Sequence, residues 1–220
     1  MLFDLDGTLL DTAADIAVAL NRALAEQGWD PLPESDVRRM IGRGGYVLLE
    51  RAAQARGRTI DAATRDRMVE RFFHHYGSLE ERHEATAQAY PGVLDSIGKL
   101  HAAGLRAAVV TNKQRRFALD LLQRLQLDRY FDVVVGGDTC ERRKPDPMPL
   151  RHACSSLGLA ASQVVSVGDS VNDVQAARAA GIPVVCVTYG YNEGQDPRLL
   201  PADAFIDSFS ELPALLRLSC

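Results

Sequence analysis

The spacing of apolar and polar positions changes once along the chain, near residue 88. Between residues 12 and 87, apolar side chains recur every three or four positions, most clearly at Ile16, Leu20 and Leu24. From residue 88 onward, short apolar runs alternate with helical stretches. The first segment therefore predicts an all-helical block, and the second predicts a sheet whose strands are connected by helices.

The apolar runs of the second segment have the length of buried strands. They span residues 105–110, 131–135, 164–167 and 184–187, with a short strand near 205–206 and another at residues 1–3. The intervening helices span residues 93–103, 117–125, 147–157 and 174–180. This alternation predicts right-handed crossovers and a mostly parallel sheet covered on both faces. We expect an α/β protein, with a Rossmann-like core (1–11 and 88–220) and an inserted all-helical cap (12–87).

Composition and charge narrow the class of protein. Hydrophobic residues make up 46% of the chain and charged residues 25%, as in ordinary soluble proteins. The net charge of −4 offers no basic surface for nucleic acid, and no apolar run is as long as a membrane span. We expect a cytoplasmic monomer or homodimer that acts on a small molecule. The scattered cysteines predict reduced thiols rather than a zinc site: Cys140, Cys154, Cys186 and Cys220.

Two aspartates directly follow the first apolar run. Asp4 and Asp6 are two positions apart, so their side chains leave the same side of the chain where the strand ends. One of two such carboxylates takes up a proton unless a cation lies between them. Hard oxygen ligands with room for water favour Mg²⁺. The alternative is an ordinary polar turn at Asp6 and Gly7.

Polar residues also follow later strands of the predicted sheet. Thr111 and Asn112 end one strand, and Asp169 ends another, with Asp173 four residues further on. Ligands of open α/β sheets bind beyond the carboxyl ends of the strands, so we expect these residues to gather with Asp4 and Asp6. Taken alone, each segment is an ordinary helix cap or turn. Their common position at strand ends favours a site.

Lys144 lies between the predicted strands at residues 131–135 and 164–167 and completes the set. Its ammonium can neutralise a nucleophile and a transferring phosphoryl group. The segment Lys144–Pro147 is alternatively only a helix start, with Asp146 as its cap. With Thr111 and the backbone N–H groups near Asn112, Lys144 can hold phosphoryl oxygens.

The acidic residues can each take a different role in the hydrolysis of a phosphate ester. Asp4 can attack phosphorus and form an aspartyl-phosphate, which divides the reaction into two steps. Asp6 can protonate the leaving group and then deprotonate the attacking water. A Mg²⁺ ion is needed because two anions must meet, with Asp169 as a second carboxylate ligand. Asp173 can orient a metal-bound water.

Four motifs resemble those of the haloacid dehalogenase superfamily of aspartate-nucleophile phosphatases. They are Asp4-x-Asp6-Gly7-Thr8, Thr111-Asn112, Lys144, and Gly168-Asp169 with Asp173. The resemblance implies that Asp4 is the nucleophile and Asp6 the acid and base. It also implies Mg²⁺ held by Asp4, the main-chain carbonyl of Asp6, and Asp169, under a helical cap that closes over small substrates.

Within the superfamily, the chain most resembles the bacterial phosphoglycolate phosphatases. The resemblance covers Val110–Lys113, Val134–Thr139, Lys144–Pro147, Val167–Ser170 and Tyr189–Asn192. It implies Mg²⁺-dependent hydrolysis of 2-phosphoglycolate; the alternative in the same class is another small phosphate ester, such as a sugar phosphate. Mutase chemistry is disfavoured, since the cap histidine of such mutases is replaced by Ile16. The rival from another class is a receiver-type signalling module, which accepts a phosphoryl group without turnover.

Substrate specificity is expected to come from the cap. Arg43 lies in the glycine-rich segment Ile41-Gly42-Arg43-Gly44 and is a candidate partner for a substrate carboxylate. The alternative is a solvated loop arginine.

Overall fold

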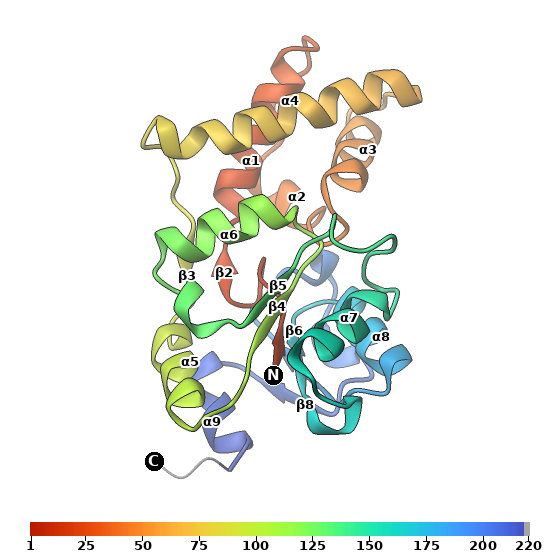
Figure 1. Ribbon diagram of the computed structural model, residues 1–220. Coiled ribbons are helices and arrows are strands. Elements are labelled where there is room, and N and C mark those ends of the chain that lie inside the picture. The colour runs from red at the N-terminus through yellow and green to blue at the C-terminus, as the bar shows by residue number, and fades with distance from the viewer. Residues whose placement is uncertain (218–220) are drawn as a thin grey trace.

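The structure, a computed structural model, describes residues 1–217 except for the side chain of residue 80. Its centre is a six-stranded parallel sheet with the order β5–β4–β1–β6–β7–β8 (Figure 1). The strands are β1 (Leu2–Phe3), β4 (Ala108–Val110), β5 (Val133–Val135), β6 (Ser166–Gly168), β7 (Val184–Val187) and β8 (Ala204–Ile206). In the central strand, Leu2 lies opposite Ala108 on one side and Ser166 on the other. The predicted α/β class with a mostly parallel sheet is confirmed.

Helices cover both faces of this sheet because its strands alternate buried side chains between the faces. Phe3 belongs to the cluster of α5 (Val93–Ala102), α6 (Arg115–Arg124) and α9 (Leu212–Leu215). Leu2 belongs to the cluster of α7 (Met148–Leu157) and α8 (Val171–Ala180) on the opposite face. Both side chains are at most 1% exposed, so the short first strand is fixed by packing on both faces.

Four helices form a separate layer beyond one end of the sheet (Figure 1). They are α1 (Ala13–Ala25), α2 (Glu34–Arg38), α3 (Gly45–Ala55) and α4 (Ala62–Glu81). The apolar series predicted from the sequence points inward: Leu20 and Leu24 are fully buried, and Ile16 is 5% exposed. Most of this hydrophobic cluster comes from α1–α4, with Phe117 and Tyr191 added from the sheet side. We keep as a proposal the division into a core (1–11 and 88–220) and a cap (12–87).

A two-stranded antiparallel sheet joins the helical layer to the rest of the chain. It pairs β2 (Leu10–Asp11) with β3 (Gln88–Ala89), so both connections to the helical layer run side by side. The sequence did not predict it, because two residues are too few for an alternating pattern. Several strands begin two or three residues later in the structure than the sequence predicts. For example, the predicted strand at residues 105–110 is observed as β4, which begins at Ala108. An apolar run reflects burial, and not all of its residues pair with a neighbouring strand.

Within residues 1–217, no helix is long and apolar enough to cross a membrane. Cys140, Cys154 and Cys186 are free thiols, as predicted, and Cys220 lies outside the described residues. The remaining short helices of the described chain are single 3₁₀ turns: η1 (Asp128–Tyr130), η2 (Ala161–Gln163), η3 (Asn192–Gly194), η4 (Pro197–Leu199) and η5 (Phe209–Glu211).

Candidate active site

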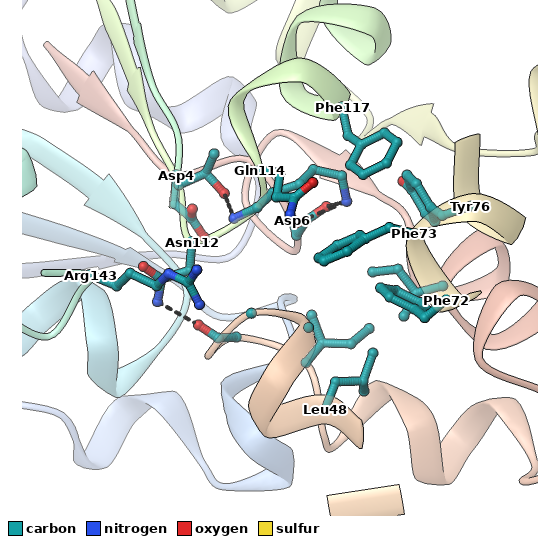
Figure 2. Close-up of a pocket in the computed structure, with 17 residues that line it drawn as sticks. Asp4, Asp6, Leu48, Phe72, Phe73, Tyr76, Asn112, Gln114, Phe117 and Arg143 are labelled. Atoms are coloured by element: carbon teal, nitrogen blue, oxygen red, sulfur yellow. Dashed lines mark hydrogen bonds and ion pairs between the residues drawn. The ribbon is translucent and has the colours of Figure 1, made fainter. Parts of the chain in front are cut away.

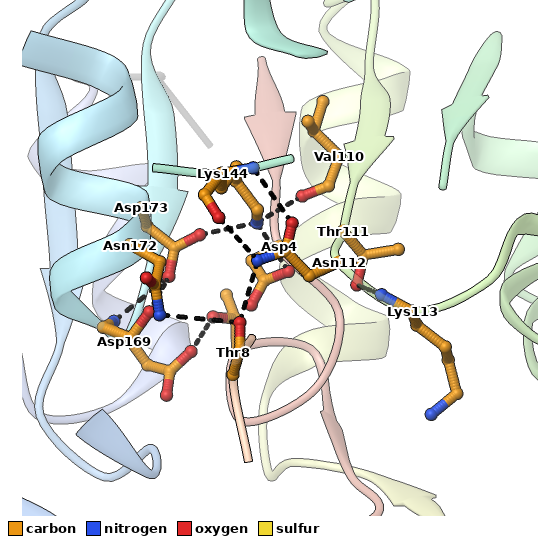
Figure 3. A network of polar contacts seen from close by, with 12 residues as sticks. Asp4, Thr8, Val110, Thr111, Asn112, Lys113, Lys144, Asp169, Asn172 and Asp173 are labelled. Carbon is orange, nitrogen blue, oxygen red and sulfur yellow. Dashed lines mark hydrogen bonds and ion pairs between the residues drawn. The ribbon is translucent and has the colours of Figure 1, made fainter. Parts of the chain in front are cut away.

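Three neighbouring strands end at the same edge of the sheet and deliver the predicted residues there. β1 is followed by Asp4, β4 by Thr111, and β6 by Asp169, and these strands are adjacent in the order β4–β1–β6. Because parallel strands end together, residues more than 160 positions apart lie side by side (Figure 3). One oxygen each from Asp4, Asp169 and Asp173 lies within 4.8 Å of the other two.

Lys144 contacts two of these three aspartates, Asp4 and Asp173. Its Nζ lies 2.8 Å from Asp4 Oδ1 and 2.6 Å from Asp173 Oδ1, and it donates to the Val110 carbonyl at 2.5 Å. Burial alone would lower the pKa of Lys144, but the charges of Asp173 and Asp4 outweigh it and raise the pKa. Lys144 is therefore a permanent cation between two carboxylates.

The side chain of Asn112 holds the backbone of Lys144. Its Oδ1 accepts from Lys144 N at 3.0 Å, and its Nδ2 donates to Lys144 O at 2.9 Å. Nδ2 also donates to the carbonyl of Gly42 in the helical layer, at 2.9 Å. The polar atoms of the Asn112 side chain are thus engaged within the protein, whereas its backbone N–H has no partner in the described part of the chain. The N–H group, not the side chain, remains available to a phosphoryl oxygen.

Asp169 is held by neutral donors. Thr8 Oγ1 donates to its Oδ1 at 3.0 Å, and the Tyr191 N–H donates to its Oδ2 at 2.7 Å. Gly7 lies against the same carboxylate with φ of +88°, and a Cβ there would be 2.6 Å from Asp169 Oδ2. Only glycine combines that conformation with so close an approach. The D-x-D-G-T motif thus supplies both a nucleophile candidate and support for a carboxylate from another strand.

Asp4 and Asp169 are the two carboxylates predicted to bind the metal ion, and the protein only partly neutralises their negative charge. Burial, followed by repulsion from Asp173, raises the pKa of Asp169 to about 7. Burial and Asp173 also raise the pKa of Asp4 well above its usual range, although Lys144 opposes the shift. Such shifts mark a site that gains from a cation.

The residues present fit a divalent metal ion. Asp173 is engaged on both oxygens, by Lys144 at Oδ1 and by the hydroxyl of Ser170 at Oδ2 (2.6 Å). Asp169 also has partners on both oxygens, but these donors are neutral, and Asp4 Oδ2 has no partner in the described chain. Asp4 and Asp169 are therefore the carboxylates best able to hold the ion, and the contacts of Asp173 agree with an orienting role. Close by in sequence, Asn172 Oδ1 is buried without a hydrogen-bond partner in the described chain. A hard, oxygen-rich donor set of this kind suits Mg²⁺.

The raised pKa of Asp169 predicts how stability depends on pH and metal. Its pKa in the folded protein, about 7, lies above the 3.8 of an unfolded aspartate, so the folded state binds more protons between these values. The free energy of unfolding without metal therefore falls as the pH rises from about 4 to about 7. Added Mg²⁺ should raise the unfolding temperature more at about pH 7 than at about pH 5, because the ion replaces the proton.

Thermal unfolding in chelator and in Mg²⁺ at both pH values measures this difference. The Asp169→Asn variant is the control, in which the dependence of the Mg²⁺ effect on pH should largely disappear. An equal Mg²⁺ effect at both pH values in the unmodified protein would contradict the prediction.

Asp6 lines the same cavity as Asp4 and is held by two side chains. Thr12 Oγ1 donates to Asp6 Oδ1 at 2.6 Å, and Lys113 Nζ lies 3.0 Å from the same oxygen. The Lys113 ammonium also lies over the ring of Tyr76, 4.5 Å from its centroid. The hydroxyl oxygen of Thr111 accepts from the Lys113 N–H at 3.1 Å, which leaves its own hydrogen free to donate.

The structure brings most of the sequence-predicted residues together and leaves one outside. Asp4, Asp6, Thr111, Asn112, Lys144, Asp169 and Asp173 form the site described above. Arg43 does not join them: its guanidinium pairs with Glu193 at 2.7 Å, and its side chain is 44% exposed. Its role as a substrate ligand stays a prediction.

Sequence reasoning assigned no role to four residues of the site. Thr8 and Ser170 support the carboxylates of Asp169 and Asp173, and both lie inside segments recognised from the sequence. Lys113 also lies in such a segment, directly after Asn112, but only the fold shows that it turns toward Asp6. Arg143 precedes Lys144 and lines the cavity in front of Asp4.

That cavity lies between the strand ends and the helical layer (Figure 2). Asp4, Asp6 and Thr111 line its floor, and Ile16, Leu48, Phe72, Phe73, Tyr76 and Phe117 supply apolar walls. Its empty space is about 680 Å³, part of which is open to solvent. The nucleophile candidate therefore faces a chamber suited to a small organic molecule.

Comparison with known proteins agrees with this architecture. The sequence model of the haloacid dehalogenase-like hydrolases matches residues 1–187. Phosphoglycolate phosphatase of Nitrosospira multiformis is 43% identical over 220 residues, which cover 100% of this chain and 96% of the relative. The plasmid phosphoglycolate phosphatase of Cupriavidus necator is 47% identical over 219 residues, 98% of this chain and 92% of the relative. The chain belongs to the haloacid dehalogenase-like hydrolase family.

Solved structures show the same arrangement. A crystal structure of a predicted phosphoglycolate phosphatase from Haemophilus somnus superimposes with a TM-score of 0.90 at 32% identity, covering 98% of this chain and 96% of the other. CbbY from Rhodobacter sphaeroides, solved in complex with phosphate, gives 0.81 at 26% identity, covering 96% and 94%. The predicted resemblance to phosphatases of this family, most of all to the bacterial phosphoglycolate phosphatases, is confirmed. The chain is an enzyme, and the receiver-type alternative is set aside.

Proposed function

We propose that the chain hydrolyses 2-phosphoglycolate to glycolate and phosphate through an aspartyl-phosphate on Asp4. The phosphatase class rests on the family and on full-length relatives that are phosphoglycolate phosphatases. The observation that carries the mechanism is the Asp4 carboxylate, fixed 2.8 Å from Lys144 Nζ at the floor of the cavity. A carboxylate fixed in this way, facing the space that a substrate would occupy, is placed for attack on phosphorus.

Each remaining residue then has a role that its contacts support. Lys144 neutralises charge on Asp4 as two anions approach, and the Thr111 hydroxyl with the Asn112 N–H holds phosphoryl oxygens. Asp6 donates a proton to the leaving glycolate oxygen and later takes one from the attacking water. Asp6 is held for both steps by Thr12 and Lys113.

The proposed cofactor is Mg²⁺, held by Asp4, Asp169 and the main-chain carbonyl of Asp6. When bound, the ion would supply positive charge that offsets the repulsion between the Asp4 carboxylate and an anionic substrate. Asp173 keeps Lys144 in place and helps to orient water. We also keep as proposals a cytoplasmic location and a monomeric or homodimeric state.

Phosphate release from a panel of small phosphomonoesters tests the proposal. We expect kcat/KM to be highest for 2-phosphoglycolate and turnover to disappear in chelator and return with Mg²⁺. Sugar phosphates should be poorer substrates than 2-phosphoglycolate. Preference for a sugar phosphate would overturn the substrate while leaving the reaction class, and turnover that persists in chelator would overturn the cofactor.

A further inference from the structure

We propose that Arg143 is the specificity-determining residue that binds the carboxylate of the substrate. This inference rests on the proposed function, because 2-phosphoglycolate carries a carboxylate two bonds from the ester oxygen. The phosphoryl end is met by Asp4, Lys144 and Thr111. A second cation in the same cavity can pair with the carboxylate at the other end of the molecule.

The cavity has two cations on its walls, Lys113 and Arg143, among the described residues. The charge of Lys113 is already neutralised: its Nζ lies 3.0 and 3.3 Å from the two oxygens of Asp6. Arg143 has no carboxylate within ion-pair distance among residues 1–217. Arg143 is half-buried. A half-buried guanidinium without a counterion can bind an anionic ligand.

The guanidinium of Arg143 is fixed at one end and open at the other. Its Nε donates to the Gly137 carbonyl at 2.6 Å, whereas its two terminal nitrogens have no hydrogen-bond partner in the described chain. Those terminal nitrogens can donate to both oxygens of a carboxylate, a geometry that lysine cannot provide. Restriction of the side chain before binding lowers the entropy lost when the ligand arrives.

The glycine-rich loop of the helical layer leaves room for this side chain. Gly44 has φ of +81°, and a Cβ on it would lie 3.2 Å from Arg143 Nη1. In Figure 2, Arg143 stands with Asn112 on the side of the cavity opposite the aromatic side chains Phe72, Phe73, Tyr76 and Phe117. The loop therefore contributes space for Arg143, whereas its own Arg43 turns away to Glu193.

The test compares 2-phosphoglycolate with ethyl phosphate, which has the same heavy-atom skeleton up to the second carbon but no carboxylate. Arg143→Gln should raise KM for 2-phosphoglycolate by about 10- to 100-fold, the value of a hydrogen-bonded charge pair. It should change KM for ethyl phosphate by less than about threefold. Arg143→Lys should recover part of the loss, because it restores the charge without the paired donors.

Neighbouring arginines provide matched comparisons. Arg142→Gln removes the same charge one residue away, from a side chain that is 69% exposed and pairs with Asp146, and should leave both KM values unchanged. Arg43→Gln tests the rival assignment. Selective loss on 2-phosphoglycolate in Arg43→Gln but not in Arg143→Gln would overturn the inference, as would equal loss on both substrates in Arg143→Gln.

Binding without turnover separates this inference from the proposed function. By calorimetry with Mg²⁺ present, Arg143→Gln should weaken 3-phosphonopropionate, which replaces the ester oxygen by CH₂, about 10- to 100-fold. Binding of propylphosphonate, which lacks the carboxylate, should stay the same. If the unmodified enzyme does not prefer 2-phosphoglycolate to ethyl phosphate, the proposed function fails. If it does and Arg143→Gln keeps that preference, only the role of Arg143 fails.

Discussion

Replacement of Asp4 by asparagine should lower kcat for 2-phosphoglycolate by at least about 10⁴-fold, as expected when a covalent nucleophile is removed. Asparagine keeps the shape of the side chain but cannot form the acyl-phosphate. The fold should survive, because burial already disfavours the charged form of Asp4 and the amide is neutral. Phosphate release measures the loss, and thermal unfolding in chelator measures the fold.

The matched control is Asp30→Asn, the same chemical change on an exposed loop residue, which should leave kcat unchanged. A variant Asp4→Asn that unfolds at the temperature of the unmodified protein yet keeps more than about a hundredth of its kcat would contradict the assignment. Activity of that size would mean that another group attacks phosphorus.

Replacement of Lys144 by methionine should damage both activity and stability. Lys144 Nζ is buried and contacts Asp4, Asp173 and the Val110 carbonyl, so its loss leaves two buried carboxylates without their cation. Breaking a buried ion pair in this way costs about 3–5 kcal/mol of unfolding free energy. We expect kcat to fall by about 10³-fold or more, because the charge that lets two anions meet is lost.

The loss of stability should depend on pH in a defined direction. Burial and neighbouring aspartates raise the pKa of Asp4, and Lys144 opposes that shift, so the loss of Lys144 destabilises the protein through the ionised form of Asp4. The stability difference from the unmodified protein should therefore shrink as the pH is lowered. Denaturant unfolding at two pH values measures it. Lys99→Met, at a lysine that is 53% exposed and pairs with Asp95, is the control and should lose little. A stability loss in Lys144→Met that grows at low pH would contradict this account.

The core of the site could be predicted from the sequence because its residues occupy strand ends. Asp4, Thr111 and Asp169 each directly follow an apolar run, and the parallel sheet places those ends side by side. The alternation of such apolar runs with helical stretches predicted the fold class. Packing on both faces then fixes even the two-residue strand β1.

The partners of charged side chains could not be predicted in the same way. Arg43 and Arg143 both stand beside recognised segments, and no local pattern shows which one faces the cavity. The choice depends on Glu193, which lies 150 positions from Arg43 in the chain and pairs with it. Lys113 likewise finds Asp6 across 107 positions. Long flexible side chains are directed by tertiary contacts, and these are absent from the spacing of residues.

The pairing of β2 with β3 escaped prediction for a related reason. Leu10 and Ala89 meet only because the helical layer returns the chain to its starting point. Neither strand has enough residues to alternate, and their pairing depends on the whole intervening segment. The paired connection between the helical layer and the sheet therefore becomes visible only in three dimensions.

The stereochemical course at phosphorus tests the central claim most directly. When one phosphoryl oxygen of 2-phosphoglycolate is replaced by sulfur and another by a heavy oxygen isotope, hydrolysis in water labelled with a third oxygen isotope yields chiral inorganic thiophosphate. The configuration of that thiophosphate can be assigned. Two successive displacements, first by Asp4 and then by water, predict overall retention. Overall inversion would show a single direct attack by water and would contradict an aspartyl-phosphate on Asp4.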